Sequence, residues 1–167
     1  ETFTTAQRAL GFGPTSPDHL LAPGELRQRF ADFDVLFYED KLGGLRLVGI
    51  TDGGINVLPT LEQKKQIIEN ALLALHALGF DRPRVAIMSA TEVVTDAIPS
   101  TVEARALTEM AVGGAFGDCG VFGPLALDNA LLECAAQAKG ISSQVAGHAD
   151  VMVMPNIEAG NLLGKAV

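Results

Sequence analysis

Four segments of the sequence have residue types suited to holding a ligand, and each follows an apolar run. They are residues 50–59, 89–101, 123–130 and 155–165, and all are rich in Gly, Ser, Thr, Asn and Asp. These residues supply tight turns and neutral hydrogen-bond donors. Ligands of open α/β sheets bind beyond the carboxyl ends of the strands, so these segments are the candidate binding loops. Backbone amides at helix starts can hold an anionic ligand there, even in an acidic chain.

The segment 155–165 contains the strongest candidates for substrate binding. Asn156 is placed to cap a helix that begins at Ile157, and Gly160 and Asn161 follow within about its first turn. Free N–H groups and the positive end of the helix dipole favour an anion there. Lys165 lies one turn beyond Asn161, within reach of the same anion. The alternatives are packing of small residues against the sheet for Gly160 and Asn161, and a solvated surface position for Lys165.

Polar residues after other predicted strands form a second group of candidates. Ser89, Thr91 and Glu92 follow a strand directly and are candidates to line a cleft, although Ser and Thr at such places also cap their own loops. Asp52 and Asp128 each follow a strand, and Asp128 is equally placed to open a helix. We assign no catalytic residue from the sequence.

Composition and charge exclude several classes of function. Of the 167 residues 48% are apolar and 19% charged, and no apolar run approaches the roughly 18–20 residues that span a bilayer. The formal net charge is −8 without a cluster of Lys and Arg, so nucleic-acid binding is not expected. Cys119 and Cys134 lack CxxC spacing and a nearby His pair, so no metal site and no disulfide framework is predicted. His148, at a predicted strand start, is assigned a structural role.

Two further patterns bear on ligand class and location. The segment TDGGIN at 51–56 matches neither the dinucleotide fingerprint GxGxxG nor the P-loop GxxxxGK[ST]. Residues 1–10 contain no apolar region of a secretory signal, which predicts a cytoplasmic location.

A regular alternation of predicted strands and helices positions the four loops. Residues 1–33 are predicted as a loop-rich N-terminal segment and residues 34–167 as one α/β region. The predicted strands are 34–38, 45–51, 84–90, 119–123 and 149–154, and the predicted helices are 60–79, 100–110, 127–139 and 157–167. This order predicts βαβ units and a parallel sheet. The first two strands either pair as a hairpin or lie apart.

Capping signals define the predicted helices. Thr60 with Gln63, and Ser100 with Glu103, have the spacing of a capping box, and Gly79 is placed to end the first helix. The first helix has an apolar stripe formed by Ile67, Ile68, Ala71, Leu72, Leu75 and Leu78. Its polar surface is assigned to Gln63, Lys64, Glu69 and Asn70.

Several motifs follow one another along roughly residues 34–167: TDGGIN, LEQKKQIIENA, RVAIMSA, IPST, GPLALDNA and VAGHADVMVMPNIEAGN. Their order resembles the butyryltransferase branch of the phosphate acetyl/butyryltransferase (phosphate acyltransferase) family. The pairing of GPxxxDxA with a later ADxxxxPxxExGN is far more specific than a lone Gly-rich loop.

The resemblance implies a fold, a reaction and an assembly. The implied fold is α/β, with a three-layer α/β/α lobe, a mostly parallel sheet and an isocitrate/isopropylmalate dehydrogenase-like arrangement. The implied enzyme is a homodimer that transfers an acetyl or butyryl group between coenzyme A and inorganic phosphate, by direct attack of the thiol on the acyl-phosphate carbonyl. Coenzyme A, acyl-CoA and phosphate are then substrates, and no further cofactor or metal is expected.

One part of the family pattern is not found in this sequence. In the family a Ser-Arg segment and a following Asp, which polarise the thioester and activate the thiol, come after the AGN helix, whereas this sequence ends at Val167. The front of the family's first lobe is not matched either. We therefore expect this piece alone to be nearly inactive.

Two alternative functions fit the same motifs. One is the acetyl-phosphate-forming subunit of a glycine-reductase-type complex, and the other is a non-catalytic ligand-binding or assembly module of the same fold. Nothing in the sequence identifies an acyl pocket, so the length of the acyl chain stays open.

Overall fold

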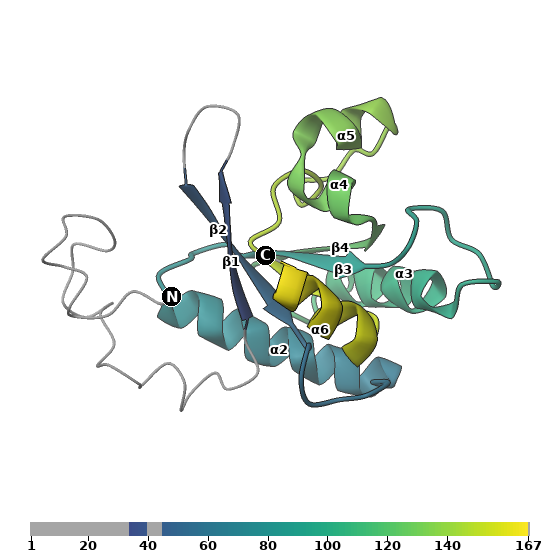
Figure 1. The fold of residues 1–167 in the computed structure, drawn as a ribbon, viewed down its shortest axis with the longest axis horizontal. Helices are drawn as coiled ribbons and strands as arrows, with labels where there is room; N and C mark the ends of the chain where they lie inside the picture. The colour runs from purple at the N-terminus through teal and green to yellow at the C-terminus, as the bar shows by residue number, and fades with distance from the viewer. Residues whose placement is uncertain (1–33, 40–44, 167) are drawn as a thin grey trace, which may run out of the picture.

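A five-stranded sheet forms the centre of the computed structural model, which describes residues 34–39 and 45–166 (Figure 1). Its strands are β1 (Asp34–Glu39), β2 (Leu45–Thr51), β3 (Arg84–Met88), β4 (Gly120–Leu125) and β5 (Val151–Val153). Their order in the sheet is β1-β2-β5-β3-β4. The strands β1 and β2 pair antiparallel, while β2, β5, β3 and β4 are parallel neighbours. The mostly parallel sheet is therefore confirmed, and the first two strands adopt the paired alternative.

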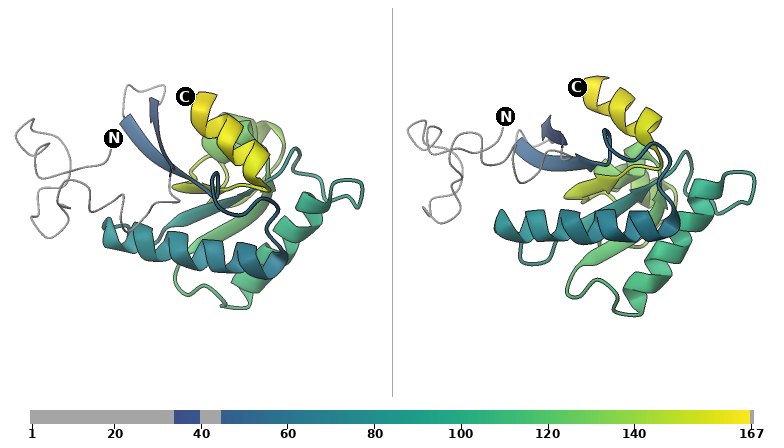
Figure 2. Two further views of the ribbon diagram at one scale, coloured as in Figure 1. Left: turned by 60° about the horizontal axis from the view of Figure 1, so that its bottom comes forward. Right: turned by 90° about the horizontal axis from the view of Figure 1, so that it is seen from below.

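Helices cover both faces of the sheet. They are α2 (Leu61–Ala77), α3 (Pro99–Val112), α4 (Leu127–Leu131), α5 (Glu133–Ala138) and α6 (Ile157–Ala166). Figure 2 shows α2 and α3 on one face and α4, α5 and α6 on the other. None of the described helices is long and apolar enough to cross a membrane. The predicted loop-rich segment 1–33 lies outside the described residues.

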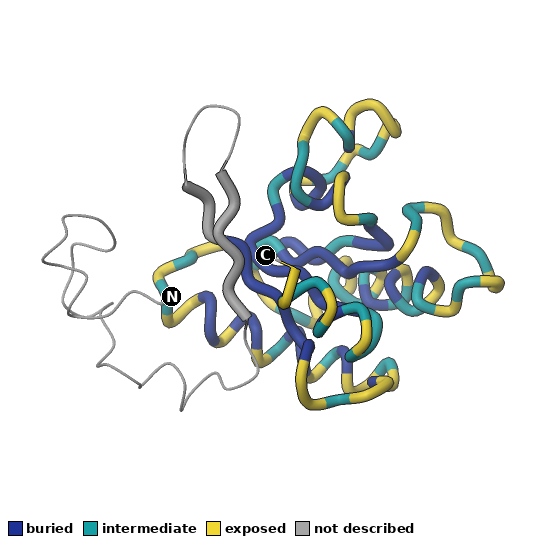
Figure 3. Tube along the Cα trace, viewed as in Figure 1, coloured by how far each residue is buried: buried dark blue, intermediate teal, exposed yellow. Residues whose placement is uncertain are grey.

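Alternating strand residues divide the apolar core into two layers. Val85 and Ile87 of β3 pack with α2 and α3, whereas Ala86 and Met88 pack with the helices of the opposite face. The same alternation holds along β5. Side chains of successive strand residues point to opposite faces, so a strand that is apolar throughout needs cover on both sides. The predicted α/β/α layering is thereby confirmed, and β3, β4, β5 and the end of β2 form the buried centre in Figure 3.

The start and end of α2 follow the sequence signals. Thr60 Oγ1 accepts the N–H of Gln63 at 3.3 Å, and Gln63 Oε1 accepts the N–H of Thr60 at 2.9 Å, so the capping box is confirmed. Gly79 directly follows Leu78, the C-cap residue of the helix. Its φ angle is 91°, a backbone conformation that favours glycine. The predicted apolar stripe is buried from Ile67 to Leu75, and its last residue, Leu78, is half-buried.

The predicted capping box at Ser100 is wrong. The helix α3 begins at Pro99, and Ile98 is its N-cap without a side-chain hydrogen bond. Proline fits the first helical position because its ring fixes φ and it has no N–H to satisfy. Ser100 therefore lies inside the first turn, and its hydroxyl and the Glu103 carboxylate are free for contacts with other elements.

The predicted helix 127–139 is also wrong, because it is divided into α4 and α5 at Leu132. Leu132 has extended backbone angles, φ −114° and ψ 116°. The carbonyl of Asn129 accepts the N–H of Gly147 at 2.8 Å, and the carbonyl of Ala130 accepts the N–H of Ala149 at 3.2 Å. A continuous helix needs those carbonyls for its own amides, so the tertiary bonds end α4 early.

Loss of the Thr60 hydroxyl is expected to destabilise the chain. Thr60→Ala removes an acceptor for an amide of the first turn and should lower the free energy of unfolding by ~1 kcal/mol. Thr60→Ser, the matched control, keeps the oxygen and should stay close to the parent. Urea denaturation followed by circular dichroism measures both, and equal stability of the two variants would contradict the capping role.

Candidate functional site

A cavity of about 580 Å³ lies where β3 and β5 end. Its walls come from the helices α2, α3, α4 and α6, from the end of β3 and from loop residues beside them. They are Leu58, Lys64, Met88, Ser89, Ala90, Pro99, Ser100, Glu103, Leu127, Met154, Pro155, Asn156, Ala159 and Leu163. All four predicted binding loops contribute to it, as expected for the carboxyl edge of a parallel sheet.

A partly buried ion pair forms one side of the cavity. The Lys64 ammonium of α2 contacts the Glu103 carboxylate of α3, and the two side chains are 4% and 33% exposed. The assignment of Lys64 to polar surface is therefore wrong. Lys64 precedes Ile67 and Ile68 by three and four positions, which places it on the apolar face of the helix, a signal present in the sequence. A buried charge needs such a partner, so the pair holds α2 and α3 in register beside the cavity.

Two serine hydroxyls meet on the adjoining wall. Ser89 Oγ lies 2.8 Å from Ser100 Oγ, and both residues line the cavity. In such a pair one hydroxyl donates to the other, which leaves the second hydroxyl hydrogen available to a ligand. Ser89 is a predicted site residue, whereas the sequence predicts Ser100 as a helix cap. Thr91 does not line the cavity, and its hydroxyl accepts the N–H of Val93 at 3.3 Å, which is the loop-capping alternative.

Asn156 lines the cavity and also caps α6. Its Oδ1 accepts the N–H of Ala159 at 2.9 Å, which confirms the predicted cap. The N–H of Ile157 donates to the carbonyl of Val57 at 3.1 Å, and that of Gly160 to the carbonyl of Asn156 at 3.1 Å. Protein acceptors thus engage these amides of the helix start. The anion site expected here stays a prediction, and an anion would compete with these bonds.

Gly160 and Asn161 contact the loop after β2 rather than the cavity. A Cβ on Gly160 would lie 2.8 Å from Gly53 Cα and 2.9 Å from the carbonyl oxygen of Asp52. Asn161 Nδ2 donates to the carbonyl of Gly53 at 3.2 Å. Both residues therefore hold the loop against α6, and their contact with substrate stays a prediction. Lys165 is exposed near the end of α6, outside the cavity lining.

The Asp52 carboxylate gives that loop its shape. It accepts the N–H groups of Gly54, Ile55 and Asn56 at 3.1, 2.9 and 2.8 Å, together with the Asn56 side-chain amide at 2.6 Å. Burial raises the pKa of Asp52, but these hydrogen bonds outweigh burial and hold the pKa below its ordinary 3.8. Asp52 is thus a charged organiser of the loop and not a poised proton acceptor.

Glu92 and Asp128 belong to a second polar cluster. Lys139 Nζ lies 3.2 Å from a carboxylate oxygen of each, and Asn129 Nδ2 donates to Glu92 at 3.3 Å. These contacts fasten the loop after β3 to α4 and α5. Both carboxylates are therefore assigned to positioning.

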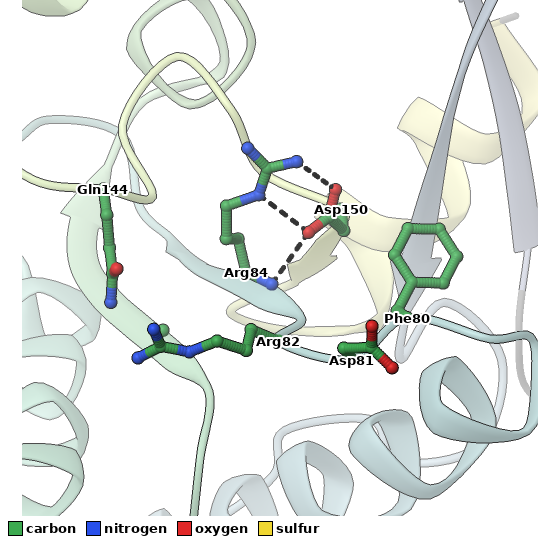
Figure 4. A pocket seen from close by; sticks show the side chains of 7 residues that line it. Phe80, Asp81, Arg82, Arg84, Gln144 and Asp150 are labelled. Carbon is green, nitrogen blue, oxygen red and sulfur yellow. Dashed lines mark hydrogen bonds and ion pairs between the residues drawn. The ribbon is translucent and has the colours of Figure 1, made fainter.

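A smaller cavity of about 360 Å³ lies at the opposite edge of the sheet (Figure 4). There the Arg84 guanidinium donates to the Asp150 carboxylate, from Nη2 to Oδ1 at 2.7 Å and from Nε to Oδ2 at 2.9 Å. The backbone N–H of Arg84 also donates to Oδ2 at 2.9 Å. In Figure 4 Arg82 and Gln144 are set apart from this pair. The pair joins the starts of β3 and β5, so we assign this edge to the scaffold.

The described residues contain no group of three or more His, Cys, Asp and Glu side chains that could hold a metal ion. The candidate site is therefore built from hydroxyl, amide and apolar groups beside one neutralised ion pair.

The close approach of α6 to the loop after β2 predicts that a methyl group added at Gly160 destabilises the chain. Alanine favours helix interiors over glycine by about 1 kcal/mol, yet Gly160→Ala should lower the free energy of unfolding because its Cβ overlaps Gly53 and Asp52. Gly54→Ala, whose Cβ would meet nothing within 4 Å, is the control in the same loop. Thermal and urea unfolding compare the two, and a stabilised Gly160→Ala variant would refute the contact.

The depressed pKa of Asp52 predicts a pH dependence. A carboxylate whose pKa is lower in the folded chain adds stability above its unfolded pKa and loses it as pH falls through the folded pKa. Asp52→Asn should therefore be less stable than the parent at neutral pH, and the gap should narrow as pH falls below 3.8. Urea unfolding across pH 3 to 7 measures the gap, and a constant gap would contradict the assignment.

Comparison with known proteins places the fold and the site in context. The chain is 49% identical over 130 residues to "Phosphate acetyltransferase" of Rhizobium meliloti, covering 78% of this chain and 41% of that protein. It is 44% identical over 122 residues to "Phosphate butyryltransferase" of Clostridium acetobutylicum, covering 73% of this chain and 40% of that protein. The chain thus spans less than half the length of these relatives.

A solved structure and a family match agree with these relatives. A branched-chain phosphotransacylase from Enterococcus faecalis V583 superposes with a TM-score of 0.68 at 34% identity, over 80% of this chain and 47% of that one. The sequence model described as "Phosphate acetyl/butaryl transferase" matches residues 30–167. On this match and these identities, the chain belongs to the phosphate acetyl/butyryltransferase family.

Proposed function

We propose that this chain is part of an enzyme that transfers a short acyl group between coenzyme A and inorganic phosphate. The observation that carries the proposal is the family match over residues 30–167, together with relatives named phosphate acetyltransferase and phosphate butyryltransferase at 44–49% identity. These relatives are more than twice as long as the matched region, so the activity belongs to the whole protein.

The proposed reaction is a direct transfer. The thiol of coenzyme A loses its proton and attacks the acyl-phosphate carbonyl, a C–S bond forms, the C–O bond to phosphate breaks, and phosphate leaves. The enzyme has to activate the thiol and stabilise the developing oxyanion. Asp52 is engaged by its loop and Glu103 by Lys64, so we assign neither the role of base. We infer from the family resemblance that the thiol-activating residues lie in the segment that follows the AGN helix.

The site residues divide into two roles under this proposal. Ser89 and Asn156 line the cavity and are proposed to contact substrate. Gly160 and Asn161 support the site by fixing the loop after β2 against α6. Contact of Lys165 with a substrate phosphate, and of Thr91 with substrate, remains a prediction.

We further infer a homodimer in the cytoplasm. Ile55, Val57 and Leu58 in one loop are 58%, 70% and 74% exposed, and such clustered apolar side chains are typical of subunit interfaces. Cys119 and Cys134 are both free, as is usual in a reducing compartment, where coenzyme A thiols also persist. Light scattering of the purified protein tests the assembly.

The activity test uses the complete reading frame and the chain of residues 1–167 side by side. With butyryl phosphate and coenzyme A, the complete protein should form the thioester, and the chain alone should do so hardly above the uncatalysed rate. Thioester absorbance follows the reaction, with enzyme omitted as the control. Absence of turnover of both acetyl and butyryl phosphate by the complete protein would refute the proposal.

A further inference from the structure

The relatives of this chain differ in the acyl group that their names state. Proteins named for acetyl and for butyryl transfer are similarly close to it, at 49% and 44% identity. The two acyl groups differ by two methylenes. An enzyme discriminates between them through apolar side chains that surround the hydrocarbon tail. An inference about which residues of this chain contact the acyl tail therefore rests on the proposed function.

The cavity at the carboxyl edge has an apolar wall suited to a short hydrocarbon tail. Met88 is the last residue of β3 and Met154 directly follows β5; their exposed fractions are 4% and 6%. Ala159 and Leu163 approach from successive turns of α6, and Leu127 from α4. Methionine side chains adapt to ligands of different shape, so this wall can hold tails of more than one length.

The polar wall of the same cavity is neutral but rich in donors. Lys64 is balanced by Glu103, so the wall has no unpaired charge to attract an anion. One of the two hydroxyls of Ser89 and Ser100 donates its hydrogen to the other. The hydrogen of the second hydroxyl is then available to an acceptor on a ligand. A carbonyl oxygen is such an acceptor, whereas a phosphate dianion would be better served by a free cation.

We propose that this cavity is the acyl-chain pocket of the enzyme. The tail packs against Met88, Met154, Ala159 and Leu163, and the carbonyl oxygen accepts a hydrogen bond from the Ser89–Ser100 pair. The tail and carbonyl are common to acyl phosphate and acyl-CoA, so either substrate presents the same group. The cavity of about 580 Å³ is larger than a butyryl group, which leaves room for the start of the attached phosphate or thioester.

The four methionines of the chain make the pocket directly observable. Met88 and Met154 line it, while Met110 packs with the core on the other face of the sheet. Methyl-labelled residues 1–167 are titrated with 2-oxopentylphosphonate and 2-oxopropylphosphonate, stable analogues of butyryl and acetyl phosphate. The Met88 and Met154 resonances should shift and Met110 should not. The longer probe should bind roughly tenfold more tightly, since it buries two more methylenes.

Variants in adjacent positions of α6 separate the pocket from the outer surface. Leu163→Ala removes part of the wall and should reduce the preference for the longer probe at least threefold. Leu162→Ala, whose side chain is 72% exposed, should leave the preference unchanged. Ala159→Leu narrows the pocket without removing core and should weaken the longer probe more than the shorter one, which keeps the test valid if Leu163→Ala is poorly folded.

Thioester probes identify which substrate delivers the acyl group. Butyryl-CoA, acetyl-CoA, free coenzyme A and inorganic phosphate are titrated in the same way. Methyl shifts of Met88 and Met154 that depend on tail length, with the phosphonates, the thioesters or both, support the pocket. The class of probe that causes them identifies the substrate that places its acyl group there. The pocket is overturned if no probe shifts Met88 and Met154, if Met110 shifts as much, if both tail lengths bind equally, or if free coenzyme A acts like butyryl-CoA.

The outcome is separable from that of the proposed function. Tail-dependent methyl shifts without turnover by the complete protein would overturn the enzyme assignment alone. Turnover of butyryl phosphate without tail-dependent shifts at Met88 and Met154 would overturn the pocket alone.

Discussion

Insertion of β5 between β2 and β3 is the constraint on which the rest of this structure depends. β5 is the last strand in the chain, yet it lies in the middle of the sheet and pairs in parallel with both neighbours. Its residues Val151, Met152 and Val153 are fully buried. Hydrogen bonds at its two ends fix its position, from Asp150 N–H to the carbonyl of Arg84 and from Met154 N–H to the carbonyl of Thr51. Without β5 the β1–β2 pair would have no strand contact with β3 and β4.

The candidate site follows from that insertion. Because β3 and β5 run in parallel, Ser89 and Asn156, which are distant in sequence, come to one edge of the sheet. The Lys64–Glu103 pair then sets how α2 and α3 flank that edge, while Gly160 allows α6 to approach the loop after β2. The Arg84–Asp150 pair clamps the same strands at their other end. Scaffold and binding groups are thus placed at opposite ends of the same strands.

Features set by neighbouring residues could be predicted from the sequence. The capping box at Thr60, the glycine end at Gly79 and the cap at Asn156 depend on contacts within a few residues, and the structure has all three. The apolar runs also predicted the strands, with ends displaced by up to two residues. The layering followed, because strands apolar throughout require helices on both faces.

Features set by distant residues could not be predicted in this way. The division between α4 and α5 depends on amides of Gly147 and Ala149, which no local pattern reveals. Ser100 has the spacing of a cap but faces Ser89, and Glu103 faces Lys64, so a tertiary contact outweighed the local signal. Of the site, Ser89 and Asn156 were predicted, whereas its apolar wall was not, since core and pocket residues have the same composition.

The most direct test of the central role of β5 is native-state hydrogen exchange of residues 1–167. The amides of Asp150 and Met154 report the two seams that β5 makes, one with β3 and one with β2. Both should exchange only through global unfolding, in the same class as the slowest amides of β3. Fast exchange at Met154 with slow exchange at Asp150 would show that the β1–β2 pair separates from an independent β5–β3–β4 unit, and would contradict the central role of β5.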